Sequence, residues 1–147
     1  FQMAITTAMC NSFKQELLGG VHDLDTHTLK IALIKGSHSG TYNASTTNYS
    51  DVTGNSDEAS GTGYSAGGQN LDSASITLSG STAFVDFADE VFSTATVSAD
   101  GAIIYNSSAS NKAIAVFSFG STVTSTNGDF TVVFPTADAS NAVIRIA

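Results

Sequence analysis

The sequence predicts an all-β fold, an antiparallel β-sandwich or jelly roll with one short N-terminal α-helix. Three observations carry this prediction. Short runs of β-branched and aromatic residues recur about every 8–12 residues, separated by turn-forming residues. Only 12% of the 147 residues are charged, and Gly, Ser, Thr and Asn take their place. Helical periodicity occurs in one stretch alone, close to the N-terminus.

The stretch 100–119 is the predicted centre of the core. Two apolar runs, Ala102–Tyr105 and Ala113–Phe117, flank a cluster of turn-forming residues at 106–111. This arrangement is typical of a β-hairpin. Successive side chains of a strand point to opposite faces, and both faces of these runs are apolar. We therefore expect a central hairpin that the rest of the sandwich covers on both sides.

The predicted helix precedes the first strand. Met9, Phe13 and Leu17 recur at the spacing of one helix face, with Leu18 beside them, and Gly19-Gly20 offers a stop. So short a helix is marginal alone and must dock on a surface. We favour packing over a sheet edge; the alternative is a contact with a neighbouring subunit. Candidates for the residue that caps its start are Thr6, Thr7 and Asn11.

The polar segment Val21–Thr28 contains two histidines and two aspartates, His22, Asp23, Asp25 and His27. Nitrogen and oxygen ligands at this spacing can reach one cation. We favour a solvated connector in which Asp23 or Asp25 caps a turn, because the sequence nominates no further ligand. The prediction is therefore no metal site and no cofactor.

A clear strand, Leu29–Lys35, is followed by the long polar segment 36–63. This segment exceeds an ordinary connection, so we expect a surface excursion, with one short strand or with order supplied by a neighbouring chain. Tyr42, Tyr49 and Tyr64 are candidate binding contacts, since tyrosine offers a large amphipathic surface. The alternative, that they pin the segment to its own domain, is at least as well supported.

The letters of residues 61–66 match the glycine pattern GxGxxA of a dinucleotide-binding turn. That turn must follow a strand and open a helix. Gly67 and Gly68 come next, and neither favours a helix start. We therefore reject the nucleotide interpretation and predict a bend and a short strand over Tyr64–Leu71.

From residue 73 onward the chain is predicted to be strand after strand, within one domain spanning 3–147. Phe1 and Gln2 resemble the end of a protease-cleavable tag and are interpreted as its remnant, with Met3 as the natural start. The remaining predicted strands are Ser75–Leu78, Ala83–Phe87, Val91–Val97, Thr131–Phe134 and Ala142–Ile146. A tight turn is predicted at Ala99–Gly101, and the strand from Thr131 follows the polar residues Asn127–Asp129.

Little in the sequence supports a catalytic site. Asp86, Asp89 and Glu90 are close together but are interpreted as part of a solvated turn rather than as a catalytic pair. The segment 36–40 sets serines beside His38 without the strained turn of a serine nucleophile, and we predict a mobile loop tip. Cys10, the only cysteine, is interpreted as a small buried residue on the helix. We predict no catalytic residues and no enzyme.

Charge and hydropathy argue against two classes of partner. Thirteen acidic residues face five basic ones, which gives a net charge of −8. No basic stripe is available for phosphates, and an anionic membrane would repel the chain. No apolar run approaches the ~20 residues of a membrane-spanning helix, and we expect no secretory signal. We predict binding to neither nucleic acid nor membrane.

Several stretches, taken in order, resemble a group of small proteins encoded among the virion genes of tailed bacteriophages. The resemblance spans most of the chain, from the helix to the last strand, and implies a component of the particle on the head surface or tail. It is a structural pattern, so it implies no active residues. The stretches that carry it are 13–23 (FKQELLGGVHD), 29–33 (LKIAL), 61–68 (GTGYSAGG) and 101–106 (GAIIYN), leading to 127–132 (NGDFTV).

The function expected from these observations is that of a non-enzymatic bacteriophage virion structural protein, first of all a capsid decoration or cement protein. It would be made in the host bacterial cytoplasm and would contact major capsid or tail proteins in the virion. A homo-oligomer is expected, with a trimer suggested by virion geometry alone. The alternative is a tail-associated module that binds a host surface glycan or receptor through the tyrosines of segment 36–63.

Overall fold

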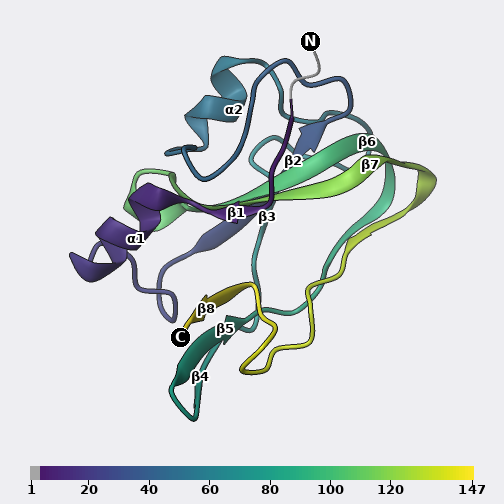
Figure 1. The fold of residues 1–147 in the computed structure, drawn as a ribbon. Helices are drawn as coiled ribbons and strands as arrows, with labels where there is room; N and C mark the ends of the chain where they lie inside the picture. Colours follow the sequence, from purple (N-terminus) through teal and green to yellow (C-terminus); the bar gives the residue numbers. More distant parts are fainter. Residues whose placement is uncertain (1–3) are drawn as a thin grey trace.

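The computed structural model describes residues 4–147, so the interpretation of Phe1, Gln2 and Met3 concerns residues outside the described range. It confirms the all-β prediction, with 46% of the residues in strands and 11% in helices. The strands form two antiparallel sheets that share one core, arranged in a sandwich-like way (Figure 1). Of the helices among these residues, none is long and apolar enough to cross a lipid bilayer.

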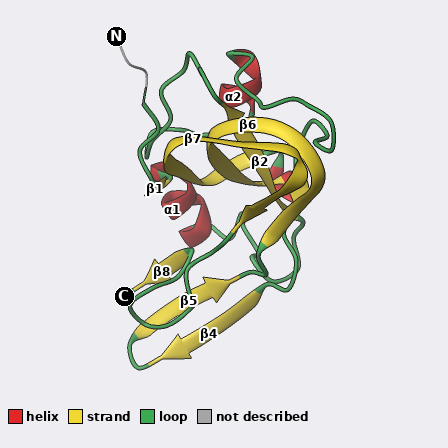
Figure 2. Cartoon of the chain, turned by 90° about the vertical axis from the view of Figure 1, so that its right-hand side faces the viewer, coloured by secondary structure: helices red, strands yellow, loops and turns green. Residues whose placement is uncertain are grey.

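The main sheet has five strands around one long hairpin. Its spatial order is β1 (Ala8–Met9), β7 (Lys112–Val132), β6 (Glu90–Asn106), β2 (Leu29–Lys35) and β3 (Gln69–Asn70). Figure 2 shows β6 and β7 curling together along their length. The small sheet has the order β4 (Ser75–Ser79), β5 (Thr82–Asp86) and β8 (Ile144–Ile146) and lies below the main sheet in both views.

The central hairpin is confirmed. Ile103 pairs with Val116 and Ile104 with Ala115, and all four side chains are buried. The turn contains one turn of 3-10 helix, η1 (Ser107–Ala109), as the polar cluster predicted. The hairpin is covered on both faces because neither face of its apolar runs is polar enough to meet water.

The tight turn predicted at Ala99–Gly101 is wrong, and the polar residues Asn127–Asp129 do not end a strand either. β6 and β7 run continuously through these positions, and the pairing register shifts instead, as at a β-bulge. Gly101 allows the shift, because a side chain there would meet the backbone oxygen of Phe117 at 2.2 Å. Turn-forming letters therefore mark irregularities inside long strands as well as their ends.

The predicted helix forms as α1 (Asn11–Leu18), with Phe13 buried against the main sheet. The expected caps, Thr6, Thr7 and Asn11, are wrong, because Cys10 precedes the helix in an extended conformation and its side chain makes no capping bond. The backbone N–H of Cys10 donates to Ile114 O at 2.9 Å, so the sheet itself fixes the helix start. Burial raises the pKa of the Cys10 thiol to about 12, which fits the predicted buried residue.

Segment 36–63 is held by its own chain. It contains a second short helix, α2 (Ser50–Gly54), and buries Tyr42, Val52 and Asp57. Isolated bridges join it to the body, including Ile34 with Glu58. The order of this segment therefore comes from within the chain, and the excursion is in large part a packed layer above the main sheet (Figure 1).

Candidate functional site

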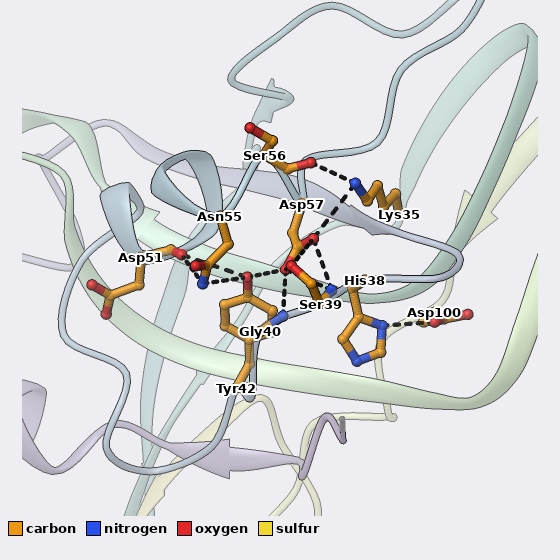
Figure 3. Close-up of polar contacts among 10 residues, drawn as sticks. All are labelled: Lys35, His38, Ser39, Gly40, Tyr42, Asp51, Asn55, Ser56, Asp57 and Asp100. Carbon is orange, nitrogen blue, oxygen red and sulfur yellow. Dashed lines mark hydrogen bonds and ion pairs between the residues drawn. The ribbon is translucent and has the colours of Figure 1, made fainter. Parts of the chain in front are cut away.

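Asp57 holds the first half of segment 36–63 together. Its carboxylate is buried and accepts hydrogen bonds from Ser39 N at 2.9 Å, Gly40 N at 2.7 Å and the Tyr42 hydroxyl at 2.6 Å (Figure 3). Lys35 Nζ lies 3.6 Å away. Burial alone would raise the pKa of Asp57, but these hydrogen bonds outweigh it and lower the pKa below its usual range. Asp57 thus acts as a structural anchor.

Glu58 holds the second half. Its carboxylate accepts hydrogen bonds from the hydroxyls of Tyr49 and Tyr64, and from Gly67 N at 2.6 Å. Tyr49 also stacks on Tyr105, with ring centroids 4.4 Å apart. Burial raises the pKa of the Tyr49 and Tyr64 hydroxyls. Together with Tyr42, these tyrosines pin the segment to its own domain, which was the second of the two interpretations.

The glycine-rich stretch after Glu58 lies directly on strand backbones. A side chain on Gly61 would lie 1.9 Å from Thr96 O, and one on Gly68 would lie 1.8 Å from Ile31 O. No helix follows Gly68, since the next element is β3, inside the predicted Tyr64–Leu71 strand. The glycines are therefore needed for close backbone packing, and the helix that a dinucleotide-binding turn would open does not follow them.

His22 and His27 meet at the buried side-chain amide of Asn106. With Asn106 Nδ2 as the donor, the Nδ1 atoms of His22 and His27 accept hydrogen bonds at 3.0 and 2.9 Å. His22 Nε2 contacts Glu16 Oε2 at 2.6 Å. Asp23 accepts bonds from the backbone N–H groups of Asp25 and Thr26, as the turn interpretation predicted. Within residues 4–147 no three His, Cys, Asp or Glu side chains are placed to share an ion.

His38 is anchored instead of lying at a free loop tip. Its Nδ1 lies 2.7 Å from Asp100 Oδ2, and Asp100 also accepts a bond from the Thr122 hydroxyl. The His38 side chain is 8% exposed. Asp89 lies in the connection from β5 to β6 and accepts a bond from Phe134 N. Glu90 begins β6 and is buried, so the predicted solvated turn is wrong at this residue. His38, Asp100 and Asp89 thus use their side chains to hold the segments in which they lie.

An apolar groove between α1 and the small sheet offers a different kind of surface. Two adjoining depressions of about 410 and 430 Å³ share Leu17 and Ile146. Figure 2 shows α1 directly above β8, and residues of both elements line the second depression. Leu18 is 92% exposed, although it stands next to the buried face of the helix. We call this surface the α1–β8 groove; its other lining residues include Met9, Lys14, Leu24, Ile76, Phe84 and Arg145.

The charges at the Leu18 end of the groove are positive on a strongly negative chain, whereas Asp23 lines its other end. Lys14 and Arg145, two of the five basic residues, line the same depression as Leu18. Apolar surface with basic residues at its rim suits an apolar segment that carries acidic side chains. The α1–β8 groove is therefore the candidate functional site.

Comparison of the chain with family models, curated proteins and solved structures finds no match. The site thus has to be interpreted from its own geometry. Sequence reasoning missed the groove, although one signal was present. Leu18 lies beside the helix stripe that Phe13 and Leu17 define, and a leucine outside the buried face is a candidate contact. The two predicted roles of α1, packing at a sheet edge and contact with another subunit, are compatible, because Phe13 packs inward while Leu18 is exposed.

Proposed function

We propose that this chain is a non-enzymatic structural protein of a bacteriophage virion, first of all a capsid decoration protein, and that the α1–β8 groove is its contact with another virion protein. The observation that carries the proposal is the exposed apolar surface around Leu18, on a small domain whose interior is already well packed. The resemblance in sequence pattern to small virion proteins supports the same role.

The chemistry of the interior supports a structural role. Asp57 and Glu58, the acidic residues that a reaction could recruit, hold backbone and tyrosine groups of segment 36–63. The glycan-binding alternative depended on tyrosines of that segment, and the hydroxyls of Tyr42 and Tyr49 bond to these two carboxylates. The groove, in contrast, exposes apolar area that no part of residues 4–147 covers.

The occupant we propose is an apolar segment of a major capsid or tail protein that places acidic side chains beside Lys14 and Arg145. Burial of Leu18 supplies most of the affinity, since apolar area removed from water is the main favourable contribution in such contacts. The ion pairs at the rim set orientation and make binding weaker at high salt. Because the chain binds the assembled particle and not its separate subunits, binding shifts the equilibrium toward the assembled particle and so stabilises it.

The test begins with purified virions of the phage that carries the gene, searched for this chain by peptide mass spectrometry. Particles assembled without the chain are then mixed with purified protein and sedimented. We expect the wild type to sediment with the particles and Leu18→Lys to bind at least about tenfold more weakly. Val133→Lys is the matched control, because Val133 is also exposed (71%) and lies outside the groove. Virions that lack the chain would refute the proposal.

A further inference from the structure

Strand β4 is the uncovered edge of the small sheet. It pairs with β5 on one side, and all five of its residues are exposed. Figure 2 shows it as the outermost strand, at the far end from the main sheet. An edge strand presents a row of backbone N–H and C=O groups on which another strand can form. The opposite edge, β8, has three residues and carries Arg145, so it is a poorer template.

The turn determines which backbone groups of β4 face outward. Gly80 and Ser81 form the two-residue turn, and Ser79 pairs with Thr82 next to it. In such a hairpin the pair closest to the turn exchanges hydrogen bonds, and bonding pairs then alternate. Ser79, Thr77 and Ser75 therefore bond to β5. The backbone N–H and C=O groups of Ile76 and Leu78 therefore point outward in the plane of the sheet, away from β5.

The side chains of Ile76 and Leu78 form an apolar stripe on one face of β4. Ile76 is 54% exposed and Leu78 71%. They lie opposite Val85 and Ala83 of β5, which in turn pair with Ile144 and Ile146 of β8. One face of the small sheet is thus entirely apolar, and its β4 side is open to water.

Electrostatics allow an identical copy to approach at this edge. The chain has a net charge of −8, so most pairs of surfaces from two copies repel each other. Between Asp72 and Asp86, however, no residue is charged, and this neutral stretch contains all of β4 and all of β5 except its last residue, Asp86. The edge also lacks the lysines and prolines that commonly prevent strand pairing.

We propose that β4 pairs antiparallel with β4 of a second copy of this chain, about a two-fold axis through Thr77. In this register Ile76 lies opposite Leu78 of the partner subunit, and these pairs are formed by the residues whose backbone groups point outward. The two small sheets become one continuous sheet, and the two apolar stripes join across the axis. This contact shares Ile76 with the lining of the α1–β8 groove, but it is formed by the outer edge of β4 and does not depend on the virion proposal.

The first test measures the mass of the purified full chain by light scattering and sedimentation over a range of concentrations up to about 1 mM, where even weak dimers are populated. We expect a concentration-dependent species of twice the 15.0 kDa chain mass. Leu78→Lys places a charge on the edge and should weaken the dimer at least about tenfold. Val133→Lys, with the same change of charge at the same exposure, should leave it intact.

The second test fixes the register. Residues that face each other at the axis as a non-bonded pair have Cα atoms about 4.5 Å apart, within the range of a disulfide. Under oxidation Thr77→Cys should therefore form a covalent dimer. Ser75→Cys, also exposed on β4, should not, since its copies would lie about 13 Å apart along the strands. Cys10 is fully buried and does not compete.

Three results would overturn the inference. The chain could stay monomeric at the highest concentration, or Leu78→Lys could dimerise as tightly as the wild type. Thr77→Cys could also fail to cross-link while larger assemblies form, which would indicate that β4 pairs with β8 of a neighbour. A chain that dimerises but is missing from virions would leave this inference standing and refute the proposed function, so the two failures are distinguishable.

Discussion

The main sheet of this protein and strand β4 of the small sheet use their apolar residues in opposite ways. In the main sheet β2, β6 and β7 bury Ile31, Ile104 and Ala115 side by side, and segment 36–63, anchored by Asp57 and Glu58, packs on the sheet at Tyr105. In the small sheet β4 buries none of its residues, and its isoleucine and leucine face water.

This difference separates a scaffold from a contact surface. Apolar groups in the main sheet stabilise the fold, because removing them from water is the dominant favourable term in folding. The same groups on β4, on Leu18 and on Ile146 contribute little to folding while exposed, so they are available for association. Substitutions should therefore affect stability in the main sheet and association on β4.

The sharpest test of the comparison uses one residue type in both sheets. Ile104 is fully buried in β6 between β2 and β7, whereas Ile76 is 54% exposed on β4. We expect Ile104→Ala to lower the free energy of unfolding by about 4 kcal/mol, because it leaves a cavity. Ile76→Ala should change it by about 0.5 kcal/mol or less. Urea denaturation of the monomer measures both, and equal losses would show that β4 is part of the core.

A second test concerns the glycines that allow segment 36–71 to lie on the main sheet. Gly68 and Gly20 have nearly the same backbone φ, 73° and 74°, but only Gly68 touches a strand backbone. Gly20→Ala should cost about 1 kcal/mol for the left-handed conformation. Gly68→Ala should cost about 3 kcal/mol or more, since its methyl group would collide with Ile31 O. Similar losses in thermal unfolding would contradict close packing at Gly68.

These glycines also show where sequence reasoning stops. The pattern at 61–68 predicts a bend, and the bend is present, but letters alone do not say that Gly68 must approach Ile31, 37 residues earlier in the chain. The hairpin at 100–119 was predictable because its signal is local: two apolar runs and one turn. The bulges of β6 and β7 were missed because a bulge and a turn use the same residue types.

The polar anchors of segment 36–63 also depend on contacts between residues that are distant in the sequence. Asp57 and Glu58 stand in a stretch that appears solvated, and their role emerges only when Ser39, Tyr42 and Gly67 fold back on them. The candidate groove is harder still to predict, because it joins Leu18 to Ile146 from opposite ends of the chain. Periodicity locates elements, whereas exposure depends on what covers them.

The third test removes the anchor at Asp57. Asp57→Asn keeps the size of the side chain but replaces one accepting oxygen by an NH₂ group that faces donors. We expect a loss of about 2–3 kcal/mol in the free energy of unfolding at pH 7. Asp25→Asn, on the exposed connector, is the control and should stay within about 0.5 kcal/mol of the wild type.

The pH dependence gives this test a sign. The pKa of Asp57 is lower in the folded chain, so its contribution is present above the unfolded pKa and is lost as pH falls through the folded pKa. The stability gap between the wild type and Asp57→Asn should therefore narrow from pH 7 to pH 3. A gap that stays constant or widens would indicate that the carboxylate is not the stabilising form.

The smallest expected change in stability concerns Glu90, the first residue of β6, which follows the connection from β5 of the small sheet. Burial raises the pKa of this carboxyl, and nearby Asp72 also favours the protonated form. Its contribution is therefore present below the unfolded pKa and is lost as pH rises through the folded pKa. As the pH rises from 4 to 7, Glu90→Gln should gain stability relative to the wild type, by roughly a few tenths of a kcal/mol.

Asp57→Asn is the internal control, because over the same pH range it should lose stability relative to the wild type. Urea denaturation of both variants at the two pH values decides the matter, since a gain at pH 4 that vanishes at pH 7 would mean that Glu90 is stabilised as the anion.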